Sequence, residues 1–209
     1  MFSIIQAAGW PIWPLILCSF VALALVIERF ISLRAPKIAP PRLLEEVLTV
    51  TRTELPSAEV ITKLAENSVL GGVLAHGLRV AHLNPRIDHD GLKYAFESAG
   101  RAAVHRLERY LNTLGTVASA APLLGLLGTV IGMIEIFGSQ TPGSANPEQL
   151  AHGISVALYN TAFGLMVAIP SLMFYRYFRG RVDEYAITLE QAADQLLPHL
   201  ERMMHARRG

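Results

Sequence analysis

The residues best placed to do chemistry in this chain are a few hydroxyl and amide side chains inside long apolar segments. Thr129 lies in one such segment, and Ser155, Asn160 and Thr161 lie in the next. These groups can hydrogen-bond to water along a narrow path, but they do not ionise at neutral pH. The sequence therefore indicates a candidate pore lining of hydrogen-bonding groups and no set of titrating catalytic residues.

A structural role is the alternative for the two threonines, with each hydroxyl bonded to a carbonyl of its own helix. For Asn160 and its neighbour Tyr159, lining the path and packing at a subunit seam are equally open. No Asp, Glu, Lys or His lies at the centre of these segments: Glu135 lies toward the outer end of one, and Glu28 toward the inner end of the first apolar run. A conducted proton therefore needs a titrating group from another chain, or Glu135 closer to the path than its position suggests.

Small residues mark one side of each of the last two apolar segments. Gly125, Gly128 and Gly132 recur at spacings of three and four, and Gly164 belongs to a similar series that includes Thr161. Small residues on one side let helices approach closely inside a membrane. We expect the four glycines to be packing residues. Pro122 lies one turn before the first of them, where neighbours or water must satisfy the freed carbonyl.

Three apolar segments, 10–31, 111–137 and 152–178, are long enough to cross a bilayer as helices. The whole chain of 209 residues is 52% hydrophobic and only 17% charged. Trp10 and Trp13 open the first segment, as is typical of a membrane interface. We therefore predict an all-α membrane protein with three transmembrane helices. A soluble helical domain with buried helices is the disfavoured alternative.

The distribution of positive charge predicts the orientation of these spans. Eleven Lys or Arg residues lie from Arg34 to Arg109 and six lie from Arg176 onward, whereas none precedes Arg29 and none separates the second and third spans. Basic residues accumulate on the cytoplasmic side. The sequence thus predicts an outer N-terminus (1–9), a cytoplasmic helical region (32–110), an outer loop (138–151) and a cytoplasmic helical tail (179–209).

The cytoplasmic region contains helix signals. Ser57 is expected to cap a short helix, and Asp88 or Asp90 the next long one. From about Gly91 the apolar pattern predicts a helix that continues without a stop into the second span, so that it projects far out of the membrane. The third span is expected to continue likewise into the tail, with Pro198 bending or ending it.

The chain lacks the residues that several classes of protein function require. No phosphate-binding loop, nucleophile elbow or pair of catalytic carboxylates is present, so we expect no enzyme and no cofactor. Cys18 is the single cysteine, and the histidines lack metal-ligand spacing. A net charge of +1 gives no argument for nucleic-acid binding. The first apolar run ends in Glu28-Arg29 and follows no basic stretch, which favours a retained anchor over a cleaved signal.

Two long motifs carry a resemblance to a known family. The run APLLGLLGTVIG from Ala121 to Gly132 and the run ALYNTAFGLMVAIP from Ala157 to Pro170 are similar to the ExbB/TolQ/MotA proton-channel family. The ExbB-type biopolymer transport proteins are the branch they resemble most. The three-span layout agrees over the whole chain, whereas the MotA branch resembles a four-span layout.

This resemblance implies a function. Such proteins form a pentameric ring of long helices around a pore in the bacterial inner membrane, with a periplasmic N-terminus and loop and a cytoplasmic C-terminus. Single-span ExbD-type partners each bring one membrane aspartate into the pore, and a TonB-type transducer carries the motion to outer-membrane transporters. The resemblance assigns Thr129 and Thr161 as pore threonines and Pro122 and Pro170 as helix-distorting prolines. We expect the cytoplasmic arginines to face membrane lipids.

One position departs from the pattern. Many ExbB proteins have a glutamate five residues before the second pore threonine, where this chain has Val156 beside Ser155. Either the aspartate of the partner suffices, or this chain uses a different water path. The other functional readings are a TolQ-type envelope-maintenance subunit, a motility motor subunit and a membrane scaffold that conducts nothing.

Overall fold

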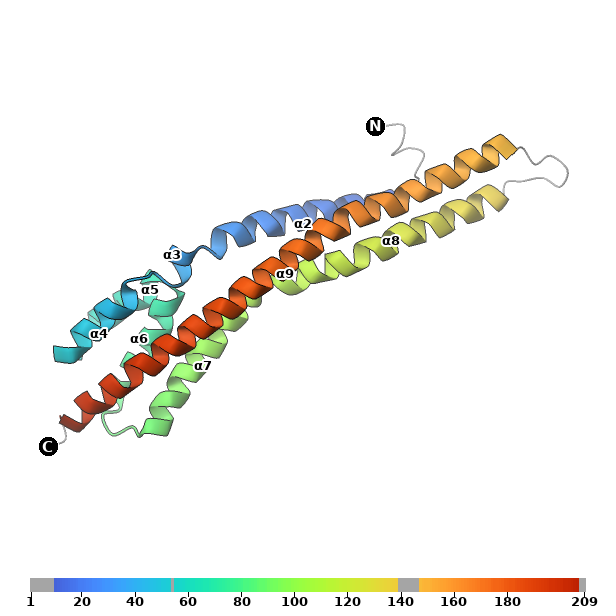
Figure 1. Cartoon of the computed structure of the whole chain (residues 1–209). Helices are drawn as coiled ribbons and strands as arrows, with labels where there is room; N and C mark the ends of the chain where they lie inside the picture. Colours follow the sequence, from blue (N-terminus) through green and yellow to red (C-terminus); the bar gives the residue numbers. More distant parts are fainter. Residues whose placement is uncertain (1–9, 54, 139–146, 207–209) are drawn as a thin grey trace. The chain divides into compact units, whose positions relative to one another are not determined.

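The computed structural model describes residues 10–53, 55–138 and 147–206, and within these ranges every regular element is a helix. It confirms the predicted all-α class (Figure 1). The helices are α2 (Ile12–Ser32), α3 (Ala35–Ile38), α4 (Leu43–Thr53), α5 (Ala58–Asn67), α6 (Val69–Leu83), α7 (His89–Glu108), α8 (Leu111–Gly138) and α9 (Pro147–Ala206).

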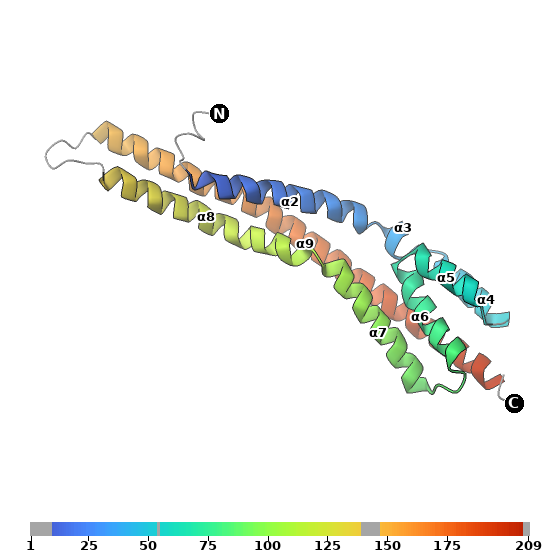
Figure 2. The same ribbon diagram turned by 180° about the vertical axis from the view of Figure 1, so that it is seen from behind.

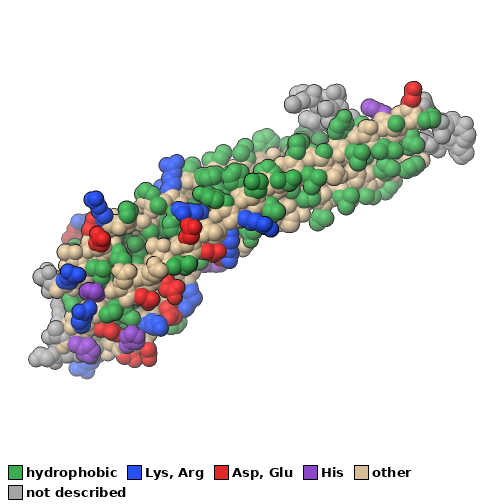
Figure 3. Space-filling model, in the orientation of Figure 1, with side chains coloured by type: hydrophobic (Ala, Val, Ile, Leu, Met, Phe, Trp, Pro, Cys, Tyr) green, Lys and Arg blue, Asp and Glu red, His purple; other side chains and the backbone are tan. Residues whose placement is uncertain are grey.

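The chain divides into two compact units. The first, called here the apolar unit, comprises Met1–Arg29 and Tyr110–Tyr177, and the second, the polar unit, comprises Phe30–Arg109 and Phe178–Gly209. Figure 3 shows hydrophobic side chains over the visible face of the apolar unit, and charged side chains of both signs on the polar unit.

The apolar unit consists of most of α2, all of α8 and the first half of α9, which lie side by side in both views (Figures 1 and 2). Three helices, in α2, α7–α8 and α9, are long and apolar enough to cross a membrane, as predicted. Only 17%, 28% and 33% of their most apolar stretches is buried within this chain. The remaining apolar surface must meet lipid or other protein chains.

The long helix predicted from Gly91 into the second span is interrupted, which corrects that prediction. Helix α7 ends at Glu108, and α8 starts at Leu111 after a two-residue turn. The Arg109 N–H bonds to the Arg106 carbonyl at 3.4 Å, a tightened final turn. In the apolar unit, the Arg29 guanidinium lies 5.0 Å from the centre of the Tyr110 ring, and this cation–π contact involves the second residue of the turn.

The prolines inside the long helices do not end them. Pro122 lies within α8, and Pro170 and Pro198 lie within α9, which continues to Ala206. The prediction that Pro198 could end the tail helix is therefore wrong. Leu196 and Leu200, on either side of Pro198, are fully buried in the core of the polar unit, and this packing offsets the backbone hydrogen bond that a helix-interior proline removes.

The predicted outer loop, 138–151, is shorter than expected at its C-terminal end. Residues 139–146 lie outside the described residues, but α9 already begins at Pro147. Proline suits the first helical position because its missing N–H has no helical acceptor there. Glu148 in the first turn complements the helix dipole. The residues 147–151 are therefore helical, while the sides of the membrane and the N-terminal segment 1–9 stay predictions.

The polar unit packs α4, α5, α6, α7 and the second half of α9 around a leucine-rich core. Two predicted caps are present: the Ser57 hydroxyl accepts the Val60 N–H at 3.5 Å, and Asp88, not Asp90, accepts the Gly91 N–H at 2.9 Å. Core side chains with essentially no exposure include Leu74, Leu78, Leu92, Leu189, Leu196 and Leu200.

Within the polar unit, Tyr185 of α9 forms a hydrogen bond with the residue that follows α2. Its hydroxyl donates to the Leu33 carbonyl at 3.0 Å and accepts a hydrogen bond from Arg181 at 3.0 Å. Desolvation lowers the pKa of Arg181, but its interactions with Tyr185 and Glu184 outweigh that effect and leave the pKa raised above its ordinary value. This network satisfies a carbonyl at the point where α2 has ended.

Candidate functional site

The site is built on the contact between α8 and α9 in the apolar unit, where glycines bring two helix backbones together. A Cβ atom on Gly125 would lie 2.7 Å from the Asn160 carbonyl oxygen and 3.0 Å from the Thr161 Cα. A Cβ atom on Gly164 would lie 2.6 Å from the Ala121 carbonyl oxygen. Side chains at either position would push the helices apart, so the spacing of α8 and α9 depends on these glycines.

Asn160 occupies the space that a second glycine leaves open. A Cβ atom on Gly128 would lie 2.8 Å from the Asn160 Cβ and 2.9 Å from its Nδ2. Asn160 is only 2% exposed, although it carries a polar amide in an otherwise apolar helix. One turn further along the contact, a Cβ atom on Gly132 would lie 3.3 Å from the Ala157 Cβ. The amide is thus enclosed between the two helices.

Thr161, next along the chain, lies at the same contact. Its hydroxyl oxygen is buried and has no hydrogen-bond partner among the described residues. Leaving a buried hydroxyl unsatisfied costs about 1–3 kcal/mol, and threonine in a helix can usually avoid this by bonding to its own backbone. The hydrogen-bonding capacity of the Thr161 hydroxyl is therefore unused within the described residues.

The other candidate hydroxyls do bond to their own helices. Thr129 donates to the Leu126 carbonyl at 2.7 Å, and Ser155 donates to the Ala151 carbonyl at 2.9 Å. This is the structural arrangement considered from the sequence as the alternative to a pore role. Thr129 also lines an open cavity of about 480 Å³ on α8, together with Val130, Met133, Ile134 and Phe137.

The carboxylates near these helices lie where the sequence placed them. Glu135 is exposed on α8, and Glu28 is held by Arg29, whose Nη2 donates to it at 2.8 Å. Arg29 itself is buried, with an exposure of 5%. Among the residues that the structure describes, no group of three His, Cys, Asp or Glu side chains could hold a metal ion.

Sequence reasoning missed two buried polar residues of the apolar unit. Ser171, 3% exposed, donates to the Val167 carbonyl at 2.7 Å, and Arg29 meets Tyr110 as described above. Ser171 is the next member of the small-residue series that holds Thr161 and Gly164. Extending that series by three residues from Ala168 could have identified it. No local signal links Arg29 to Tyr110, because the contact joins residues far apart in sequence.

Comparison with known proteins supports one family. The model of the MotA/TolQ/ExbB proton channel family matches residues 65–191, more than half of the chain. The biopolymer transport protein ExbB-like 3 of Synechocystis is 35% identical over 192 residues, which cover 89% of each chain. The biopolymer transport protein exbB1 of Vibrio cholerae is 30% identical over 206 residues, 96% of this chain and 89% of its own.

A relative from another branch is also similar. The Tol-Pal system protein TolQ of Pseudomonas aeruginosa is 36% identical over 126 residues, 58% of this chain and 54% of its own. The family match spans α8 and the part of α9 that build the glycine contact. The chain described here is a membrane protein that belongs to the MotA/TolQ/ExbB proton channel family.

Proposed function

We propose that this chain is the ring-forming, proton-conducting subunit of an inner-membrane motor, and that it works with an ExbD-type partner to energise a TonB-type transducer. The family match and the near full-length similarity to a biopolymer transport protein support this function. The observation that carries it is the buried Thr161 hydroxyl, which has no hydrogen-bond partner among the described residues. Polar groups inside membrane spans usually face the interior of a helix bundle or a water-filled cavity, so a buried hydroxyl is a candidate for the path.

The proposed division of labour follows from the side chains at the α8–α9 contact. Asn160 and Thr161 can hydrogen-bond, but neither ionises at neutral pH. Val156, where many ExbB proteins have a glutamate, cannot titrate at all. The membrane aspartate of the partner then supplies the proton-carrying group, and the ring supplies hydroxyls and a close-packed wall. The chain itself performs no covalent chemistry and is no enzyme in this account.

The available energy is adequate for a motor. One elementary charge that crosses a potential of 100 mV releases about 2.3 kcal/mol. Several protons passed in succession can therefore drive stepwise movement of the partner within a ring. We propose a pentamer, since the chain resembles a family that forms five-membered rings. Only a minority of each apolar helix is buried within one copy, which leaves ample surface for neighbouring copies.

Proton flux tests the role of Thr161. The ring would be reconstituted in liposomes with its ExbD-type partner, and pH-driven flux recorded for wild type, Thr161→Val and Thr161→Ser. Valine matches threonine in shape without the hydroxyl, so flux should fall at least tenfold; serine keeps the hydroxyl, so most flux should remain. Equal flux in all three proteins would contradict the proposal and would show that Thr161 only packs.

The TolQ branch gives the second candidate function, because a TolQ protein matches 58% of this chain at 36% identity. A subunit of this branch would serve envelope maintenance. Deletion of the gene separates the two: loss of TonB-dependent uptake supports the first function, and detergent sensitivity with normal uptake supports the second. A scaffold that conducts nothing would show no flux with any partner at any potential.

A further inference from the structure

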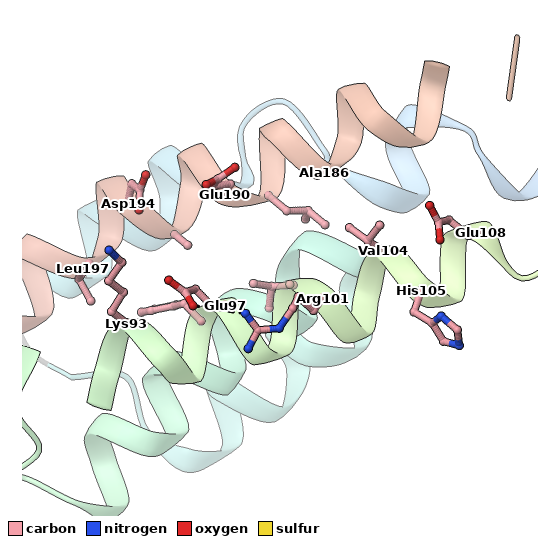
Figure 4. Close-up of a pocket in the computed structure, with 15 residues that line it drawn as sticks. Lys93, Glu97, Arg101, Val104, His105, Glu108, Ala186, Glu190, Asp194 and Leu197 are labelled. Atoms are coloured by element: carbon pink, nitrogen blue, oxygen red, sulfur yellow. Dashed lines mark hydrogen bonds and ion pairs between the residues drawn. The ribbon is translucent and has the colours of Figure 1, made fainter. Parts of the chain in front are cut away.

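A groove between α7 and α9 in the polar unit has no role in the function proposed above. It encloses about 540 Å³, and Phe96, Leu189 and Leu197 are among the apolar residues that line it. Figure 4 shows charged side chains from both helices along its length. Those that line the groove are Lys93, Glu97, Arg101, His105 and Glu108 on α7 and Glu190 and Asp194 on α9.

Unpaired carboxylates outnumber unpaired lysine or arginine side chains in this groove. Glu97 pairs with Arg101 at 3.3 Å, and Glu108 pairs with Arg179 at 2.9 Å. Lys93 on α7, and Glu190 and Asp194 on α9 four residues apart, form no ion pair with any described residue. Like charges at this spacing destabilise a helix by about 0.2–0.5 kcal/mol. A cationic surface docked on the groove would relieve that repulsion.

Gly100 leaves open space in the lining of the groove. It lies in the middle of α7 and lines the groove, and a Cβ atom added to it would meet nothing within 4 Å. The groove therefore has room at Gly100 for a side chain of another chain.

A complementary surface lies on α6 of the same unit. This helix contains no acidic residue, and its outer face presents His76, Arg79 and Leu83 at spacings of three and four. Leu83 is 76% exposed, and Arg86 follows in the turn after the helix. In the described part of the chain, Arg79 and Arg86 take part in no ion pair. We call this surface, residues 76–86, the basic stripe.

We propose that the basic stripe of one copy docks on the α7–α9 groove of the next copy. Leu83 then covers the apolar lining near Gly100, and Arg79 and Arg86 face Glu190 and Asp194. The contact joins two different surfaces of the same chain, and contacts of that kind generate rings when the rotation closes. The inference rests on the homo-oligomeric ring of the proposed function and assigns one of its subunit contacts.

Disulfide trapping tests the contact directly. In a Cys18→Ser background, which removes the single native cysteine, Leu83→Cys and Gly100→Cys are combined in one chain and oxidised in membranes. Because each copy carries both halves of the contact, cross-linking should give a ladder from dimer to the full ring. The matched control replaces Gly100→Cys with Glu45→Cys, an exposed residue of α4, and should give no ladder. Absence of the ladder, or the same ladder in the control, would overturn the proposal.

Charge exchange provides a second, independent readout. Glu190→Lys with Asp194→Lys should lower the ring fraction in native mass spectrometry at least fivefold, and so should Arg79→Glu with Arg86→Glu. The four changes together should restore most of the ring, which excludes simple misfolding as the cause. Glu45→Lys with Glu46→Lys, which alters the net charge equally on α4, should leave the ring intact.

The outcomes separate this inference from the proposed function. If the charge variants keep the ring and wild type conducts protons, the contact is wrong and the proposed function stands. If the groove variant keeps the ring but loses the ExbD-type partner, the groove binds a basic segment of that partner and the second-copy contact is overturned. If wild type forms no ring and conducts nothing, the proposed function fails first.

Discussion

At the scale of single residues, the α8–α9 contact buries polar atoms of two neighbouring side chains. Asn160 fills the space above Gly128, and the hydroxyl of Thr161 is buried without a hydrogen-bond partner among the described residues. Burying polar groups inside an apolar contact carries a desolvation cost. Positions that carry such a cost without a gain in stability are candidates for function. The α8–α9 contact is therefore the place in the apolar unit where substitutions should affect the proposed activity.

Two helix-interior glycines should respond oppositely to alanine. A Cβ atom on Gly77 would lie 2.1 Å from the Phe96 ring, so Gly77→Ala should destabilise the polar unit by about 1–3 kcal/mol. A Cβ atom on Gly100 meets nothing within 4 Å, so Gly100→Ala should stabilise it by up to about 1 kcal/mol. Thermal unfolding of the detergent-solubilised protein measures both. If both variants melt at the same temperature, the local packing described here is wrong.

At the scale of elements, the sequence predicted those features that depend on neighbouring residues along the chain. The three apolar helices and the glycine spacing along α8 follow from composition and period, which are local properties. The break between α7 and α8 could not be predicted, because no Pro or Gly marks it and the Arg29–Tyr110 contact at that point joins distant parts of the chain. For the site, Thr161 was predicted, but its missing hydrogen bond depends on rotamer and neighbours, which sequence does not show.

The cap of α7 gives a prediction at this scale. Asp88 accepts the Gly91 N–H, so Asp88→Ala should lower the free energy of unfolding by about 0.5–2 kcal/mol. Asp90 lies in the first turn and contributes only through the helix dipole, so Asp90→Ala should cost about 0.3–1 kcal/mol. Denaturant titration followed by circular dichroism compares the two. A larger loss for Asp90→Ala would contradict the assigned cap.

At the scale of the whole molecule, one copy leaves most of its apolar helix surface unburied and carries no titrating group at the centre of its predicted spans. Both features point beyond a single chain. The apolar surface must meet lipid or other protein chains, and in the proposed function the titrating carboxylate comes from a partner. The account therefore makes conduction a property of the assembly, in which this chain supplies the wall and the hydroxyls.

The most direct test of that claim is proton flux through the reconstituted ring, alone and with its ExbD-type partner, and with a partner whose membrane aspartate is replaced by asparagine. The account predicts flux only with the unaltered partner, because the ring itself holds no group that can carry the proton. Equal flux through the ring alone, or through the ring with the asparagine partner, would contradict it and would show that this chain provides the titrating group itself.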